Sequence, residues 1–280
     1  MRISNRKPGF FPLTIIFCLF IVFLYGPTLT IAILSFQGPD GGLTFPLNGL
    51  SLHWFRALFE KQQVGDFGGS LMRSLLLGFA VMICTVLFSL LAGLAYRRAF
   101  KGSTVLFYLT LVSLILPSIL ISLGIGIMFD RLGLSPHWYS SAFGAHLTWS
   151  LPFGLLIMFA VFNRFNKAYE AAAVDMGATA WQTFRLVVLP LILPSLIGVG
   201  LFGFTLSYDE FARTIMTAGS FNTLPLEIYG MTTNVTTPVL YALGTFTTVF
   251  SFILIVLTLM IITAIKRRQK KPLPSSEAHV

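Results

Sequence analysis

Six long apolar runs, separated by shorter polar segments, dominate the pattern of hydrophobic and polar positions along the chain. A helix needs about 20 apolar residues to cross a bilayer, and only the fourth run, which contains Pro152, falls short of that length. The runs are Phe11–Phe36, Leu75–Tyr96, Phe107–Phe129, His146–Phe162, Val187–Leu206 and Leu243–Ile265. We therefore predict an all-α membrane protein with six transmembrane helices over residues 11–265, an N-terminus at 1–10 and a tail at 266–280.

Composition and charge agree with this prediction. Hydrophobic residues make up 55% of the chain and charged residues only 10%, whereas a soluble domain carries about 25% charged residues. Most of the 19 Lys and Arg residues fall in the segments on one side of the predicted spans, and the positive-inside rule makes that side cytoplasmic. Both termini are then cytoplasmic, and the net charge of +9 needs no nucleic-acid partner.

This orientation predicts the side on which individual residues lie. Arg98 and Lys167 should be cytoplasmic, and Trp54, Trp138 and Thr223 should be external. The first run follows Arg and Lys residues as a signal peptide does, but it is too long and has no cleavage site, so we interpret it as a retained span. Cys18 and Cys84 fall inside runs and are interpreted as small apolar side chains.

The fifth run is rich in glycine, at Gly198, Gly200 and Gly203. Glycine allows helices to approach closely in a membrane. The run is therefore either a helix that lines a translocation pathway or one that simply packs closely against its neighbours, and the sequence favours neither interpretation.

The polar interval 163–186 has the pattern of two short helices joined by a tight turn. Ala168–Met176 is rich in helix-forming residues and ends at Gly177, which suits the left-handed position after a helix. Thr179 and Gln182 have the spacing of a capping box, which starts a second helix. The segment is thus predicted to form a compact helix–turn–helix on the cytoplasmic side, between spans four and five.

This helix–turn–helix resembles the cytoplasmic coupling loop of ABC-importer permeases. That family carries Glu-Ala-Ala, three residues, a glycine, nine residues and then Ile-x-Leu-Pro. Here nine residues separate Gly177 from Val187-Val188-Leu189-Pro190, and Asp175-Met176-Gly177-Ala178 resembles the family's Asp-Leu-Gly-Ala. The family's Glu position is occupied by Ala171, while Glu170 lies one residue earlier, about 100° away around a helix.

The resemblance implies that the loop docks into a groove on an ATPase subunit. The residues that it assigns to this contact are Glu170, Ala171, Ala172, Asp175, Gly177, Trp181 and Phe184. For Trp181 and Phe184, packing against the protein's own spans is an equal alternative.

Residues 207–231 resemble the corresponding segment of spermidine and putrescine permeases. These carry Ser-x-Asp-Asp/Glu followed by Leu-Pro-Leu-x-Ile-Tyr-x-Met, and this chain has Ser207-Tyr208-Asp209-Glu210 and Leu224–Met231. The resemblance implies a substrate-pathway role for Asp209, with Tyr208 beside it. Glu210 is the weaker candidate, because it can pair with Arg213 at helical spacing. Permeases for opines or amino-acid derivatives could share the segment.

The absence of nucleotide-binding and catalytic motifs limits what this chain can do alone. It has no Gly-x-x-x-x-Gly-Lys-Ser/Thr phosphate loop, no metalloprotease or serine-hydrolase motif and no Cys/His cluster. We therefore expect a transport subunit, not an enzyme, with no metal or cofactor of its own. A secondary transporter is less favoured, since neither inverted repeats nor ionisable residues within the spans are evident. A membrane scaffold without transport would leave the helix–turn–helix unexplained.

The family resemblance also implies partners. These are a second permease subunit, identical or different, two cytoplasmic ATPase subunits that hold ATP and Mg, and an external solute-binding protein. It places the chain in the bacterial inner membrane.

Overall fold

A computed structural model describes residues 10–60, 65–98, 100–234 and 237–269. The described chain is almost entirely helical, with a single isolated bridge between Gln37 and Leu50 outside the helices. It divides into two compact units, Met1–Phe67 with Ile228–Phe250, and Gly68–Glu227 with Ser251–Val280. The predicted N-terminus, apart from its last residue, and most of the predicted tail lie outside the described residues.

Five helical segments within the described residues are long and apolar enough to cross a membrane. They are α1 (Phe10–Leu34), α4 (Phe67–Ala95), the segment Trp138–Asn163 that contains α7 (Phe143–Asn163), the segment Ala180–Tyr208 that contains α10 (Leu189–Tyr208), and α12 (Val239–Gln269). A bent pair of helices, α5 (Ser103–Ile115) and α6 (Ser118–Arg131), provides a sixth if it is counted as one span. The predicted all-α, multi-pass fold is confirmed.

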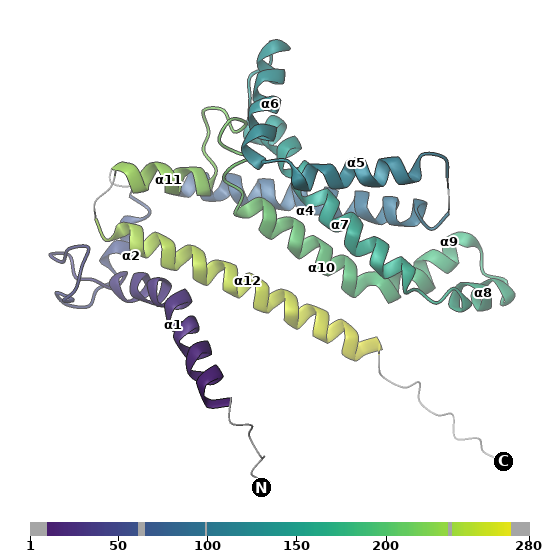
Figure 1. Ribbon diagram of the computed structural model, residues 1–280, viewed down its shortest axis with the longest axis horizontal. Helices are drawn as coiled ribbons and strands as arrows, with labels where there is room; N and C mark the ends of the chain where they lie inside the picture. Colours follow the sequence, from purple (N-terminus) through teal and green to yellow (C-terminus); the bar gives the residue numbers. More distant parts are fainter. Residues whose placement is uncertain (1–9, 61–64, 99, 235–236, 270–280) are drawn as a thin grey trace, which may run out of the picture. The chain divides into compact units, whose positions relative to one another are not determined.

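The third predicted run does not form one continuous helix. The axes of α5 and α6 differ by 105° (Figure 1). Leu116, between them, has an extended backbone, with φ −69° and ψ 135°. A proline disfavours helical geometry at the residue before it and lacks an N–H for the helix ladder. Pro117 therefore ends α5, and the third predicted span consists of two helices joined at a sharp bend.

The fourth predicted run is longer than its apolar pattern suggested. The π-helix η1 (Trp138–Ala142) leads directly into α7, and Pro152 lies inside α7 without ending it. His146 and Ser150 interrupt the apolar pattern, and both side chains are buried in the protein. Because other protein groups surround these polar residues, the helix needs less lipid-facing apolar sequence than an isolated span.

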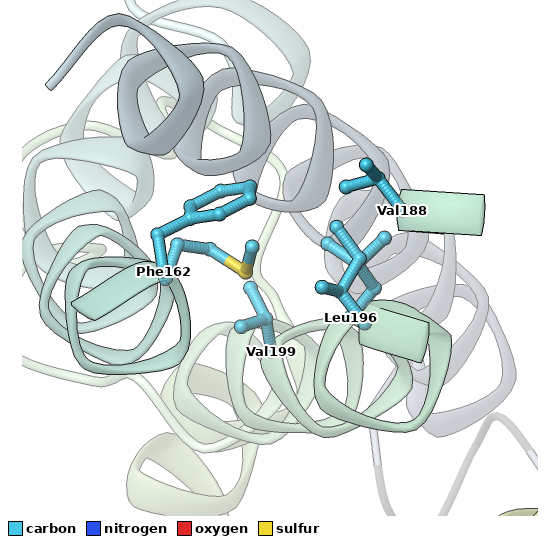
Figure 2. Packing of buried hydrophobic residues seen from close by; sticks show 6 residues of the cluster. Phe162, Val188, Leu196 and Val199 are labelled. Atoms are coloured by element: carbon cyan, nitrogen blue, oxygen red, sulfur yellow. The ribbon is translucent and has the colours of Figure 1, made fainter. Parts of the chain in front are cut away.

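The core of the second unit lies where α7 and α10 pack together, next to α4. Figure 2 shows its buried residues, Met158 and Phe162 from α7 with Val188, Ile192, Leu196 and Val199 from the π-helix η2 (Phe184–Val188) and α10. A Cβ placed on Gly200 or Gly203 would lie 3.2 Å from side chains of α4, Val86 and Thr85 respectively. Close packing thus accounts for these two glycines.

The first unit is organised by polar contacts of its loops. Gln37 follows α1 and is fully buried; its Oε1 accepts a hydrogen bond from the backbone of Asn48 at 2.7 Å. Tyr241 of α12 donates a hydrogen bond to the carbonyl of Leu43 at 2.7 Å. A short helix in this region, α2 (His53–Ala57), buries Trp54.

Candidate functional sites

The segment between spans four and five forms the predicted helix–turn–helix. α8 (Ala168–Asp175) is followed by α9 (Ala180–Thr183) and the π-helix η2 (Phe184–Val188), which continues into α10 (Figure 1). Gly177 has a φ of +84°. Its N–H donates to the carbonyl of Val174 at 2.8 Å, and that of Ala178 donates to Ala173 at 3.0 Å. These two bonds form a Schellman motif, so the predicted left-handed glycine is confirmed.

The start of the second helix is also as predicted. The Thr179 hydroxyl accepts a hydrogen bond from the backbone N–H of Gln182 at 3.3 Å, and the Gln182 side chain accepts one from the backbone of Thr179 at 2.8 Å. This reciprocal pair is a capping box. It gives the short helix a defined first turn immediately after the glycine turn.

The loop exposes apolar side chains. Met176 is 89% exposed and Trp181 65% exposed. Phe184, whose ring centroid lies 5.8 Å from that of Trp181, is half-buried against the core of the second unit. The two aromatic residues, grouped by the sequence, thus have different surroundings: Phe184 packs against the core, while Trp181 remains accessible.

The smaller residues assigned to the loop are accessible as well. Ala171, Ala172 and Asp175 are exposed on α8. Exposed large apolar groups beside small ones are typical of a surface that another protein covers.

Glu170 is an exception in this loop, because its carboxylate is held by the protein itself. It forms a bidentate ion pair with the guanidinium of Arg97, which follows the end of α4, and the Arg97 Nη1–Glu170 Oε1 distance is 2.8 Å. The hydrogen bond from Arg97 holds the pKa of Glu170 below its ordinary value, and the same bond raises the pKa of Arg97. Sequence reasoning did not connect these residues, which are 73 positions apart.

The second candidate site lies at the end of α10. Tyr208 is the last residue of that helix and is 3% exposed; its ring stacks on Phe204 with 5.8 Å between centroids. Asp209 follows as the C-cap and is exposed. Desolvation of the Asp209 carboxyl by its surroundings raises its pKa. Of the three predicted residues, Asp209 is the one with an exposed carboxylate.

Glu210 does not make the expected pair with the Arg213 side chain. Its Oε1 accepts a hydrogen bond from the backbone N–H of Arg213 at 2.9 Å. The chain leaves the helix after Tyr208, so helical spacing no longer applies and the carboxylate instead binds the N–H of a following turn. The prediction of a surface ion pair was wrong.

Arg213, which the sequence suggested only as a partner for Glu210, is fully buried. Its guanidinium donates to the Ser113 carbonyl at 3.1 Å and to the hydroxyl groups of Ser118 (3.3 Å) and Thr148. It also lies 4.8 Å from the centroid of the Trp149 ring, a cation–π contact. Arg213 thereby connects the α5–α6 break, α7 and the turn that follows Asp209.

His146 of α7 holds the same turn. Its Nδ1 lies 2.8 Å from the Ser207 hydroxyl and its Nε2 lies 2.9 Å from the Thr214 hydroxyl. The Thr214 hydroxyl donates its proton to the Glu210 carbonyl, so a neutral imidazole protonated on Nε2 satisfies all three groups. The position of an ionisable residue, His146, at the start of the fourth apolar run was the signal that could have revealed this contact.

The helical spans and the coupling-loop geometry define a polytopic transport subunit, and comparison with known proteins agrees. The family described as "Binding-protein-dependent transport system inner membrane component" matches residues 85–271, which is more than half of the chain. The chain belongs to this family of inner-membrane permeases. It is a multi-pass permease subunit of a type I ABC importer.

Several relatives have names that include a solute. The chain is 28% identical over 246 residues to the "Spermidine/putrescine transport system permease protein PotC" of Haemophilus influenzae, covering 87% of this chain and 94% of that protein. It is 25% identical over 239 residues to the "Putrescine transport system permease protein PotI" of Escherichia coli strain K12, covering 82% and 83%.

Solved structures share the fold. A bacterial ABC transporter involved in the import of the acidic polysaccharide alginate matches with a TM-score of 0.65 and 15% identity, covering 94% of this chain and 99% of that one. The MetNI methionine ABC transporter matches with a TM-score of 0.58 and 16% identity, covering 71% and 95%. At these identities the likeness concerns the fold alone.

Proposed function

We propose that this permease forms part of the translocation pathway for a polyamine such as putrescine or spermidine. The observation that carries the proposal is the exposed carboxylate of Asp209 at the end of α10. It lies in the segment that resembles polyamine permeases, and relatives over most of the chain carry polyamine names. A cationic solute that leaves water needs carboxylates or aromatic faces to replace its hydration.

The proposed assembly follows from the family and from the exposed loop. A second permease subunit, identical or different, completes the pathway; two cytoplasmic ATPase subunits hold ATP and Mg; and an external binding protein delivers the solute. The accessible apolar side chains of Met176 and Trp181 support a contact between the loop and an ATPase subunit. The N-terminus and C-terminus are cytoplasmic in this proposal, and Asp209 faces the external side.

Transport then proceeds by alternating access. Closure of the ATPase dimer on ATP moves the coupling loop, and because η2 continues into α10 without a break, the motion reaches the span that ends at Asp209. The solute-binding site is opened to the outside in one state and to the cytoplasm in the other.

The experiment is uptake of labelled putrescine and spermidine by the complete complex in vesicles supplied with the binding protein. Asp209→Asn keeps the shape and removes the charge, and we expect uptake to fall at least about tenfold, equivalent to roughly 1.4 kcal/mol in the barrier. Glu210→Gln should have less effect, because an amide oxygen still accepts the bond from the Arg213 N–H. Asp130→Asn, at an exposed carboxylate near the end of α6, is the matched control.

The outcomes separate the parts of the proposal. Normal uptake by Asp209→Asn would remove the carboxylate from the pathway. A wild-type complex that carries no polyamine would overturn the solute assignment and favour another organic solute, such as an opine or an amino-acid derivative, while the chain would remain an importer permease.

A further inference from the structure

Glu170 and Arg97 join the coupling loop to the second span. α8 packs against α9 and η2, whereas the bidentate ion pair reaches from α8 to the end of α4. Residues of both parts, including both members of the pair, line a pocket of about 700 Å³. The ion pair therefore bridges a region that is not filled by close apolar packing.

Aromatic contacts fix the Arg97 side of this bridge. The Arg97 guanidinium carbon lies 5.2 Å from the centroid of the Phe162 ring and 5.5 Å from that of Phe165. Phe162 belongs to the buried core between α7 and α10, and Phe165 follows the end of α7. A guanidinium can stack on aromatic rings and bind a carboxylate with two N–H groups at once. Arg97 thus links the loop to both α4 and α7.

We propose that Glu170 is a positioning residue that transmits loop motion to α4 and α7 through Arg97, and that it does not contact the ATPase directly. The proposal rests on the coupling role of the loop given above. Two observations support it. The carboxylate of Glu170 is already paired with an arginine of its own chain, whereas the exposed apolar side chains of Met176 and Trp181 remain available for a partner. The loop acid then maintains a rigid connection inside the permease.

A charge exchange distinguishes the two roles. In the complete complex, Glu170→Gln and Arg97→Gln should each lower solute transported per ATP hydrolysed by about threefold, which corresponds to about 0.7 kcal/mol. The double variant Arg97→Glu with Glu170→Arg should recover most of this ratio, because the pair is rebuilt in reverse. Arg98→Gln, at the exposed neighbouring cation, is the matched control and should leave the ratio unchanged.

The exchange gives opposite results if Glu170 contacts the ATPase. An arginine at position 170 would then present the wrong charge to the partner, and the double variant would be as impaired as Glu170→Gln or more so; that result overturns the proposal. Additive losses in the double variant Arg97→Gln with Glu170→Gln would also overturn it, because two members of one pair should not act independently.

Two further measurements keep the interpretation specific. Thermal unfolding of the purified complex should change little in the single variants, since a partly exposed ion pair contributes modestly to stability; a large loss would show a structural role instead. ATP hydrolysis stimulated by the loaded binding protein is measured beside uptake. If the wild-type complex takes up no polyamine, the solute assignment fails. The variants are then compared by their stimulated ATP hydrolysis.

Discussion

At the scale of single residues, buried polar groups determine where the candidate pathway carboxylate lies. Arg213, in the turn that follows α10, binds the Ser113 carbonyl near the α5–α6 break, and His146 of α7 binds the Ser207 and Thr214 hydroxyl groups on either side of Asp209. A buried charge costs free energy unless its hydrogen bonds are satisfied, and here carbonyl and hydroxyl oxygens satisfy the guanidinium. Asp209 is exposed, whereas Arg213 and Thr214, which follow it, are held in the protein.

Replacing Arg213 should therefore destabilise the protein. In Arg213→Met the part-buried Ser113 carbonyl and Thr148 hydroxyl lose the hydrogen bonds that the guanidinium donates, and a hydrogen bond with a charged group contributes about 1.5–3 kcal/mol. We expect a clear fall in the thermal unfolding temperature of the purified protein. Arg213→Lys loses the guanidinium contact with Trp149 but keeps the charge and N–H donors, so its loss of stability should be smaller. Arg131→Met, at an exposed position in α6, should change little.

Asp209 should make uptake dependent on pH. Desolvation raises the pKa of its carboxyl, so the carboxylate is protonated, as the pH falls, sooner than that of an ordinary exposed aspartate. Uptake of a polyamine should decline through that raised pKa. Asp209→Asn should remove this part of the pH profile, measured in vesicles with the internal pH held constant. An unchanged profile in the variant would assign the titration to another group.

At the scale of elements, the turn between α8 and α9 determines the form of the coupling loop. Two features do this together, the left-handed Gly177 and the capping box at Thr179. A Cβ on Gly177 would meet no atom within 4 Å. Any penalty for substitution there arises from the backbone torsion and not from a clash.

Gly177→Val and Gly177→Asn provide a test of this torsion. A β-branched residue resists the left-handed region, at a cost of about 1–2 kcal/mol, whereas asparagine tolerates it. Gly177→Val should impair ATP-driven uptake at matched expression, and Gly177→Asn should retain most of it. Equal uptake by both variants and the wild type would show that the turn is not needed for coupling.

At the scale of the whole molecule, the distribution of charge predicts the orientation in the membrane. Of the sites that the sequence suggested for the external face, Trp54 and Thr223 are buried and would react poorly with a probe. Leu50, Tyr139 and Phe221 lie near those sites and have exposed side chains, so they report on the same segments.

Single cysteines placed in a variant lacking Cys18 and Cys84 should confirm the orientation. In intact cells a membrane-impermeant thiol reagent should label positions 50, 139 and 221 and should not label positions 98 and 167. Labelling of both groups after permeabilisation shows that the internal sites are reactive. External labelling at position 167 would reverse the orientation and, with it, the cytoplasmic assignment of the coupling loop.

The sequence by itself determined the features that depend on local chemistry. Apolar run length predicts the spans, a glycine after helix formers predicts the turn at Gly177, and Thr179 with Gln182 predicts the capping box, because each involves residues close together in the chain. Pro117 also carries a local signal, but the size of the bend at that point depends on contacts made by both helices.

Only the tertiary structure decided which polar residues meet. Arg213 reaches Ser113, and Glu170 reaches Arg97, across 100 and 73 positions respectively. The local sequence does not show whether an arginine is solvated or buried, because its burial depends on the hydrogen-bond acceptors that other helices bring to it. For the same reason the sequence grouped Trp181 with Phe184. In the structure Phe184 packs against the core formed by α7 and α10, whereas Trp181 is exposed.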